Sequence, residues 1–201
     1  MHAMTKIKIC GIRRHCDIEY LNDLLPEYVG FVFAKSKRQV DCEHACKLIE
    51  NLSKGIQKVG VFVDEDPSVV IDIAEKLHLD VLQFHGHENQ EYMNKFKGYE
   101  IWKALKINNF ENISEISHYK CAKFLLDNST SGSGESFNWN LAYKKVDGNT
   151  IMLAGGLTSE NVKQGITTLN PYGVDVSSGV ETDGFKDYKK IKQFIKKVRN
   201  L

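Results

Sequence analysis

Two side chains able to exchange protons stand at the ends of apolar segments of the sequence. Cys10 closes the segment Ile7–Cys10 and precedes Gly11, and Asp127 closes the segment Ala122–Asp127. Alone, such a cysteine is more often a small buried apolar residue, and such an aspartate is often a cap or loop anchor. An ionised thiol in a positive or helix-N-terminal environment is a base, whereas a carboxyl facing an apolar surface keeps its proton and is an acid. The two residues are therefore a candidate general base and general acid.

Two segments rich in glycine and serine follow other apolar runs and are typical of oxyanion binding. Gly155-Gly156 follows the run Thr150–Ala154, and Ser177-Ser178-Gly179 follows the run Gly173–Val176. Glycine lets backbone N–H groups approach an oxyanion closely, and the helix that we expect to begin near Thr158 adds a favourable dipole. Either segment alone could be only a tight turn. Together they indicate a phosphate site.

The remaining polar motifs are weaker. The stretch Ser131-Gly132-Ser133-Gly134 comes soon after the candidate acid, and it is either a flexible linker or a mobile lid whose backbone contacts a ligand. The stretch His85-Gly86-His87-Glu88 contains a His-x-His pair, but a metal site needs further ligands that no other strand end supplies. We therefore expect no metal site.

An alternation of strands and helices must position these residues. The predicted strands are short apolar runs, many of them rich in β-branched residues: Ile7–Cys10, Val29–Phe33, Lys58–Val63, Asp80–Phe84, Glu100–Leu105, Ala122–Asp127, Thr150–Ala154 and Gly173–Val176. Predicted helices begin after Asp41, Asp66 and Asp187, each of which can cap a helix whose apolar residues recur at i, i+3, i+4 and i+7. The segment Lys106–Lys120 lacks a convincing pattern of this kind, so a short or irregular fifth helix is expected there.

Strands that alternate with helices pair in parallel, and about eight such units can close into a barrel. We therefore predict an α/β fold in which residues 1–201 form one (β/α)8-barrel domain. An open doubly wound sheet is the alternative, which the sequence Gly11-Ile12-Arg13-Arg14 after the first strand disfavours because it is not a dinucleotide-binding loop. In a barrel the catalytic groups stand at the C-terminal ends of the strands, and the last two loops frequently bind phosphate. The strand-end residues that would share this face are Cys10, His85, Asp127, Asp175 and Ser177.

The composition limits the classes of partner. The chain of 201 residues is 42% hydrophobic and 26% charged, with a net charge of +1, so an anion site has to be built locally. The sequence shows no nucleic-acid recognition motif and no membrane span, and a solvated outer face explains the basic run in the last predicted helix. Five cysteines without a CxxC pair, and the lack of a signal peptide, favour a reducing compartment. We expect a cytoplasmic protein, either a monomer or a homodimer.

The order and spacing of these motifs resemble those of the phosphoribosylanthranilate isomerases from the first strand to the last helix. The matching segments are Lys8–Ile12, Gly30–Phe33, Lys35–Arg38, Val59–Val63, Leu82–Gly86, Leu125–Asp127, Leu153–Leu157, Gly173–Glu181, and Gly184 with Lys186-Asp187. The chain departs from the family pattern at Arg13 and Phe84, at Ser131 in the possible lid, and at Glu135 and Asn138 just after it.

This resemblance implies a reaction and a role for each residue. The family carries out the Amadori rearrangement of N-(5-phosphoribosyl)anthranilate to 1-(2-carboxyphenylamino)-1-deoxyribulose 5-phosphate in tryptophan biosynthesis. Asp127 would protonate the furanose ring oxygen, and Cys10 would remove the C2 proton of the resulting imine. No cofactor is expected, because the protonated imine is itself an electron sink. Arg38 would pair with the anthranilate carboxylate, a task that suits the guanidinium fork.

The other candidate residues bind the rest of the substrate. We expect His85 and Asp175 to line the pocket. The phosphate candidates are Gly155, Gly156, Ser177, Ser178 and Gly179, with a backbone contact from Gly134.

Two other functions are compatible with parts of this pattern. Another phosphosugar isomerase of the barrel class would share both phosphate loops, but the resembling isomerases of the histidine pathway carry aspartate at the position of Cys10. A non-catalytic barrel that binds a phosphorylated metabolite would not need to retain both Cys10 and Asp127. Assays of turnover and of binding discriminate among the three functions.

Overall fold

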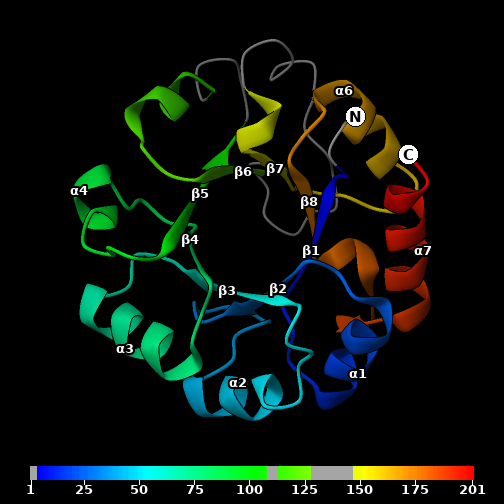
Figure 1. Ribbon diagram of the computed structural model, residues 1–201, viewed down its shortest axis with the longest axis horizontal. Helices are drawn as coiled ribbons and strands as arrows, with labels where there is room; N and C mark the ends of the chain where they lie inside the picture. Colours follow the sequence, from blue (N-terminus) through cyan, green and yellow to red (C-terminus); the bar gives the residue numbers. More distant parts are fainter. Residues whose placement is uncertain (1–3, 108–112, 128–146) are drawn as a thin grey trace.

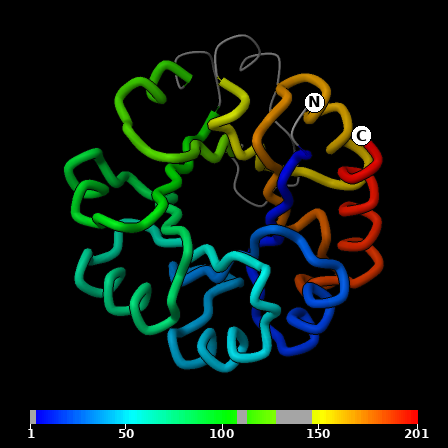
Figure 2. Tube along the Cα trace, viewed as in Figure 1, coloured from blue at the N-terminus to red at the C-terminus, as the bar shows by residue number. Residues whose placement is uncertain are grey.

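The computed structural model describes residues 4–107, 113–127 and 147–201. Eight parallel strands form a closed barrel in chain order, as the alternation predicted. The strands are β1 (Lys6–Cys10), β2 (Tyr28–Val32), β3 (Gln57–Phe62), β4 (Val81–Phe84), β5 (Glu100–Lys106), β6 (Lys123–Asp127), β7 (Ile151–Leu153) and β8 (Gly173–Val176). Figure 1 shows them at the centre with the helices around them, and Figure 2 follows the chain once around this ring. The predicted strands are confirmed.

The apolar residues of the strands pack on both sides of the barrel wall. One cluster fills the interior and consists of Tyr28, Val59, Val81, Trp102, Ala104, Leu125, Met152 and Ala154. A larger cluster lies between the strands and the helices and includes Ile9, Phe31 and Leu126. Burial on both faces explains why the strands read as continuous apolar runs rather than as alternating ones. The interior cluster makes the barrel a packed floor beneath the C-terminal strand ends.

The main helices of the outer layer are α1 (His15–Leu24), α2 (Cys42–Ile49), α3 (Pro67–Leu77), α4 (Gln90–Met93), α6 (Val162–Leu169) and α7 (Tyr188–Arg199). The three predicted caps are confirmed, since Asp41, Asp66 and Asp187 each accept a hydrogen bond from a backbone N–H of the first turn. The expectation of a helix beginning near Thr158 is wrong, because α6 begins at Val162. Asn161 Oδ1 accepts a hydrogen bond from the Thr158 N–H at 2.8 Å, which closes a turn ahead of the helix.

Two connections depart from the simple alternation. Between β5 and β6 the described residues include the 3-10 helix η1 (Glu115–His118), in agreement with the expected short or irregular fifth helix. The connection from β8 to α7 contains the 3-10 helix η4 (Ser178–Val180) and a hairpin of β9 (Glu181–Thr182) and β10 (Phe185–Lys186). Elements this short are below the length at which periodicity in a sequence is readable, so the hairpin was not predicted.

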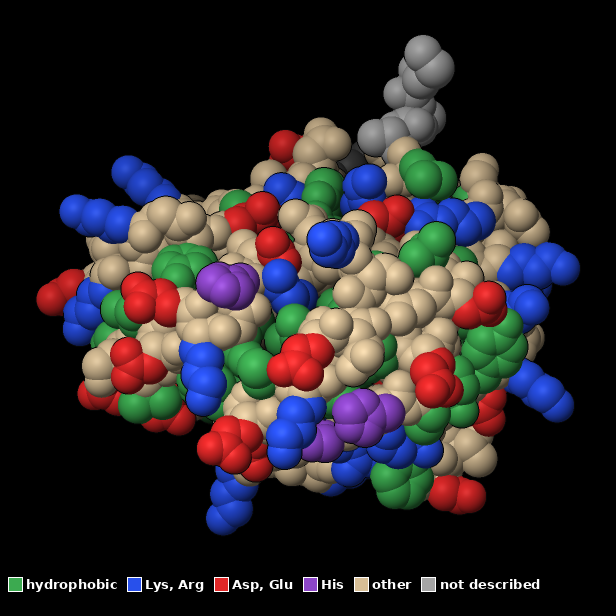
Figure 3. Space-filling model, turned by 60° about the horizontal axis from the view of Figure 1, so that its bottom comes forward, with side chains coloured by type: hydrophobic (Ala, Val, Ile, Leu, Met, Phe, Trp, Pro, Cys, Tyr) green, Lys and Arg blue, Asp and Glu red, His purple; other side chains and the backbone are tan. Residues whose placement is uncertain are grey.

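The surface agrees with the nearly neutral composition. On the face turned forward in Figure 3, acidic and basic side chains are interspersed and no region carries charge of one sign only. Within the described parts of the chain, no helix combines the length and the apolar character that crossing a membrane requires.

Candidate active site

A cavity of about 390 Å³ opens where the C-terminal ends of the strands meet. Its wall contains most of the residues singled out in the sequence, namely Cys10, Arg38, His85, Asp127, Gly155, Gly156, Asp175, Ser177 and Ser178. Gly134 lies outside the described residues, as do Ser131, Glu135 and Asn138. The barrel closure alone brings these side chains together, since they come from segments as far apart in the chain as β1 and β8.

Cys10 lies in a space that β2 leaves free. Cys10 on β1 is paired with Gly30 on β2, and Cys10 is buried. A Cβ atom built on Gly30 would lie 2.6 Å from Cys10 Sγ and 3.2 Å from Lys8 Cε. A larger residue at position 30 would therefore displace the thiol.

Charged groups around Cys10 act on its thiol in opposite directions. Burial raises the pKa of Cys10, the ammonium of Lys8 lowers it, the carboxylate of Asp175 raises it, and the ammonium of Lys186 lowers it, with a raised pKa as the result. The thiol is therefore the resting form of Cys10. The sequence left open which groups favour the thiolate, and the structure identifies them as Lys8 and Lys186.

Lys8 is a charged residue enclosed in the barrel. Its side chain is completely buried and Nζ lies 2.9 Å from Asp175 Oδ2. Burial lowers the pKa of Lys8, but Asp175 and Cys10 raise it by more, so the net direction is upward. Lys8 therefore stays protonated, and its positive charge adjoins both the thiol and the Asp175 carboxylate.

The candidate acid is held by a chain of hydrogen bonds from β4. His85 Nε2 lies 3.1 Å from Asp127 Oδ2, and Gln83 Nε2 lies 3.3 Å from His85 Nδ1. If Gln83 donates its amide proton to Nδ1, the ring carries its own proton on Nε2 and donates it to Oδ2 of Asp127. His85 therefore orients Asp127 as well as lining the cavity.

Two oxygen atoms in the cavity wall have no hydrogen-bond partner among the described residues. Gln83 Oε1 and Asp175 Oδ1 are buried and accept no hydrogen bond from the residues that the structure describes. A buried acceptor without a donor costs about 1–3 kcal/mol, so native proteins rarely keep one without a reason. Donors of a bound ligand, such as hydroxyl groups, would satisfy both oxygens.

The two candidate phosphate loops differ in how they present their groups. Gly155 and Gly156 adopt φ values of 75° and 64°, a conformation in which glycine is favoured over other residues. The Ser177 hydroxyl donates to Cys10 O at 3.0 Å, so it ties β8 to β1. Gly179 does not line the cavity, and a Cβ atom there would overlap the carbonyl of Leu157. Gly179 thus allows the two loops to pack against each other.

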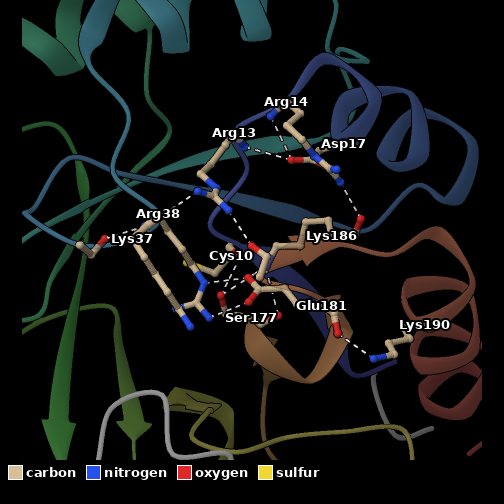
Figure 4. Close-up of polar contacts among 12 residues, drawn as sticks. Cys10, Arg13, Arg14, Asp17, Lys37, Arg38, Ser177, Glu181, Lys186 and Lys190 are labelled. Carbon is tan, nitrogen blue, oxygen red and sulfur yellow. Dashed lines mark hydrogen bonds and ion pairs between the residues drawn. The ribbon is translucent and has the colours of Figure 1, made fainter.

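Arg38 is not the solvated surface arginine that its basic neighbours in the sequence would allow. Its guanidinium makes two hydrogen bonds to Glu181, from Nε at 2.7 Å and from Nη2 at 2.8 Å. Lys186 Nζ contacts the same carboxylate at 2.7 Å and donates to Ser177 O at 3.0 Å. Figure 4 shows these side chains converging beside Cys10.

The two histidines of the His-x-His motif contact different carboxylates. His85 contacts Asp127, whereas the exposed ring of His87 contacts Asp64 at 3.0 Å. Among the described residues, no group of three or more potential ligands is arranged to hold a metal ion.

Four residues of this region were given no role from the sequence, although they stand in segments that resemble the family: Lys8, Gln83, Glu181 and Lys186. A signal existed for Lys8 and Gln83, because each is a polar residue inside an apolar strand that is buried on both faces, where it needs a specific partner. No local signal marked Glu181 and Lys186, which meet only because the short hairpin folds back.

The sequence is similar to one protein family over most of its length. A model of the family described as N-(5'phosphoribosyl)anthranilate (PRA) isomerase matches residues 7–197. The N-(5'-phosphoribosyl)anthranilate isomerases of Thermoanaerobacter sp. (strain X514) and Clostridium acetobutylicum are each 50% identical to this chain, and the matches cover 98% of it and 100% of each relative.

Solved structures of phosphoribosyl anthranilate isomerases are also similar to this chain. The phosphoribosyl anthranilate isomerase of Thermotoga maritima has a TM-score of 0.91 and 36% identity, and the match covers 98% of this chain and 100% of that one. A structure of a phosphoribosyl anthranilate isomerase in complex with reduced 1-(o-carboxyphenylamino)-1-deoxyribulose 5-phosphate has a TM-score of 0.88 and 35% identity, with the same coverage.

Proposed function

The chain belongs to the N-(5'-phosphoribosyl)anthranilate isomerase family, and we propose that Cys10 and Asp127 are the general base and general acid of its reaction. The reaction is the aldose–ketose isomerisation of N-(5-phosphoribosyl)anthranilate to 1-(2-carboxyphenylamino)-1-deoxyribulose 5-phosphate, a step of tryptophan biosynthesis. One observation carries the proposal: Cys10 from β1 and Asp127 from β6 line the same cavity as the candidate phosphate loops that follow β7 and β8.

The proton transfers follow from the two groups. Asp127 gives a proton to the furanose ring oxygen, the bond from C1 to that oxygen breaks, and a protonated imine forms. The Cys10 thiolate takes the proton from C2, and the electron pair of that C–H bond moves into the imine. The resulting enolamine tautomerises to the ketone. After Asp127 has donated its proton, the Nε2–H of His85 stabilises the carboxylate that remains.

Forming the thiolate is the demanding part of this mechanism. Burial raises the pKa of Cys10, while the ammonium groups of Lys8 and Lys186 oppose that effect. The cationic imine makes the C2 proton acidic, so a small population of thiolate beside it suffices. Lys8 and Lys186 thus act on the base by their charge, and Lys8 also by a hydrogen bond to the sulfur, without contacting the substrate in this mechanism.

The polar ends of the substrate have matching partners around the cavity. Backbone N–H groups of Gly155, Gly156, Ser177 and Ser178 bind the phosphate, and Arg38 pairs with the carboxylate of the anthranilate ring. The sugar hydroxyls donate to Asp175 Oδ1 and Gln83 Oε1, which accept no hydrogen bond from the described part of the chain. The backbone contact from Gly134 stays a prediction, because that residue lies outside the described part of the chain.

Anthranilate fluorescence tests the proposal with substrate generated in situ. Cys10→Ala and Asp127→Asn are each expected to lower kcat by at least about 10²-fold, the usual contribution of a positioned acid or base. Cys121→Ala is the matched control, since Cys121 is a partly buried free cysteine that does not line the cavity. Near-wild-type turnover in either active-site variant would refute the role given to that residue.

A second assay addresses substrate class. The aminoaldose phosphate of the histidine pathway is offered to the wild-type protein beside N-(5-phosphoribosyl)anthranilate. We expect turnover of the anthranilate compound. Preference for the histidine-pathway compound, or tight binding of the anthranilate compound without turnover, would overturn the proposal.

Five free cysteines also support a cytoplasmic location, which fractionation of cells that express the protein tests.

A further inference from the structure

We propose that Glu181 is a positioning residue for Arg38, and that it thereby sets selectivity for a substrate with a carboxylate on its aromatic ring. The proposal rests on the function proposed above, in which Arg38 pairs with that carboxylate. Glu181 does not line the cavity and acts only through the guanidinium that it holds.

The contact between the two side chains fixes the plane of the guanidinium. Nε of Arg38 donates to Glu181 Oε1 at 2.7 Å and Nη2 donates to Oε2 at 2.8 Å. The side chains are 15% and 6% exposed, so water competes little for these bonds. Two parallel N–H···O bonds to one carboxylate leave the guanidinium no freedom to rotate while both are made.

The edge of Arg38 that Glu181 leaves unused belongs to the cavity wall. Nη1 donates no hydrogen bond to any of the residues that the structure describes, and Arg38 lines the cavity. Guanidinium groups present a second pair of N–H donors on this edge, which can bind another carboxylate in the same bidentate way. Glu181 therefore holds Arg38 so that a second pair of donors remains for a ligand.

The aliphatic part of the Arg38 side chain packs over Gly11, while its guanidinium is held by Glu181. A Cβ atom on Gly11 would lie 2.5 Å from Arg38 Cδ, and Gly11 has a φ of +83°. The aliphatic part of Arg38 thus passes directly over a residue that has no side chain. Both ends of the arginine are constrained before any ligand binds, which lowers the entropic cost of binding.

The charges around Glu181 also favour a second anion. Lys186 Nζ lies 2.7 Å from Glu181 Oε1, with its side chain 1% exposed, so two cations share one carboxylate (Figure 4). Burial raises the pKa of Glu181, but Arg38 and Lys186 lower it to about 2, so the carboxylate stays charged. Burial lowers the pKa of Lys186, and the Glu181 carboxylate opposes that effect. Arg38 and Lys186 share a single carboxylate, so a carboxylate on the ligand would give Arg38 a second anionic partner.

The experiment compares two ligands that differ only in the ring carboxylate. The first is reduced 1-(o-carboxyphenylamino)-1-deoxyribulose 5-phosphate, and the second is the same compound with an unsubstituted phenyl ring. We expect Glu181→Gln to weaken binding of the carboxylated ligand by about tenfold, because the neutral amide loses the bidentate contact and Arg38 is released. Binding of the second ligand is expected to stay within about twofold, since it has no group for Arg38.

The control is Glu27→Gln. Glu27 also pairs with an arginine, since Arg199 Nη2 lies 2.7 Å from Oε1 and 2.9 Å from Oε2 of Glu27, and neither residue lines the cavity. This variant is expected to leave the dissociation constants of both ligands unchanged.

Glu181→Asp keeps the charge but withdraws the carboxylate by one methylene, and it provides a second test if Glu181→Gln does not fold. It is expected to weaken binding of the carboxylated ligand alone.

The outcomes separate this inference from the proposed function. Equal losses for both ligands in the Glu181 variants, or no loss for either, would overturn the positioning role. Arg38→Met is measured beside them. If Arg38→Met weakens the carboxylated ligand selectively and the Glu181 variants do not, only the positioning role fails. If Arg38→Met does not discriminate between the ligands either, the pairing of Arg38 with the carboxylate fails as well.

Discussion

Replacing Lys8 with methionine removes a positive charge beside the proposed base and keeps a side chain of similar length. The Lys8 side chain is 0% exposed, so water screens its charge little. A Cβ atom built on Gly30 would lie 2.6 Å from Cys10 Sγ and 3.2 Å from Lys8 Cε, so these two atoms are less than about 6 Å apart. An opposite charge at about 4–6 Å moves a pKa by about 1–3 units. Because Lys8 lowers the pKa of Cys10, its loss raises that pKa further above the ordinary thiol value.

The expected effect is a tenfold loss of thiolate for each unit of pKa. We therefore expect Lys8→Met to slow the alkylation of Cys10 by iodoacetamide at least about tenfold in the neutral range, and to lower kcat by a similar factor. Mass spectrometry of the peptide that contains Cys10 measures its alkylation separately from the other four cysteines, across a series of pH values. The midpoint of the wild-type profile should already lie above the ordinary thiol value of about 8.5.

A second variant separates the charge effect from damage to the fold. Lys8→Met leaves Asp175 as a buried carboxylate without its partner, which costs about 3–5 kcal/mol. Adding Asp175→Asn removes that charge, and because Asp175 raises the pKa of Cys10, the double variant should recover part of the alkylation rate. Lys58→Met is the control, since Lys58 pairs with Asp80 outside the cavity. An alkylation profile in Lys8→Met identical to that of the wild type would refute this account of the thiolate.

Three further expectations concern single positions. Gly30→Ala places a Cβ atom 2.6 Å from Cys10 Sγ and should lower turnover at least about tenfold. Gly55→Ala should not, because a Cβ atom there meets no atom of the described residues within 4 Å; equal turnover in the two variants would contradict the packing argument. Asp187→Ala removes the cap of α7 and should cost about 1 kcal/mol, seen as a Tm lower by about 2–4 °C with kcat retained. The folded-state pKa of Glu181 is lowered to about 2, so its ion pairs stabilise the fold fully above its ordinary pKa of 4.5, and this stabilisation is lost as the pH falls from there towards about 2. Denaturant unfolding in that pH range should show a smaller loss of the free energy of unfolding for Glu181→Gln than for the wild type. Equal losses would count against the ion pairs.

Most elements of the barrel could be predicted from patterns of neighbouring residues in the sequence. The eight strands were readable because burial on both faces selects continuous apolar runs, as in Lys123–Asp127, and the caps were readable because Asp41, Asp66 and Asp187 each satisfy N–H groups within the next few residues. The start of α6 was misplaced because a turn closed by Asn161 precedes it. A turn and a first helical turn share the same residues and hydrogen-bonding groups, so spacing does not distinguish them.

The sequence alone determined the fold class and which residue types stand at the strand ends, because strand periodicity, capping and the strand-to-loop transition all depend on residues close together in the chain. Tertiary structure decided how those residues act on one another. The pairs Lys8 with Asp175 and Arg38 with Glu181 join residues 167 and 143 positions apart, and no local pattern encodes such a contact. The charge state of Cys10 depends on the same closure of the barrel, because burial and neighbouring charges from β1, β8 and β10 determine it only when these strands meet.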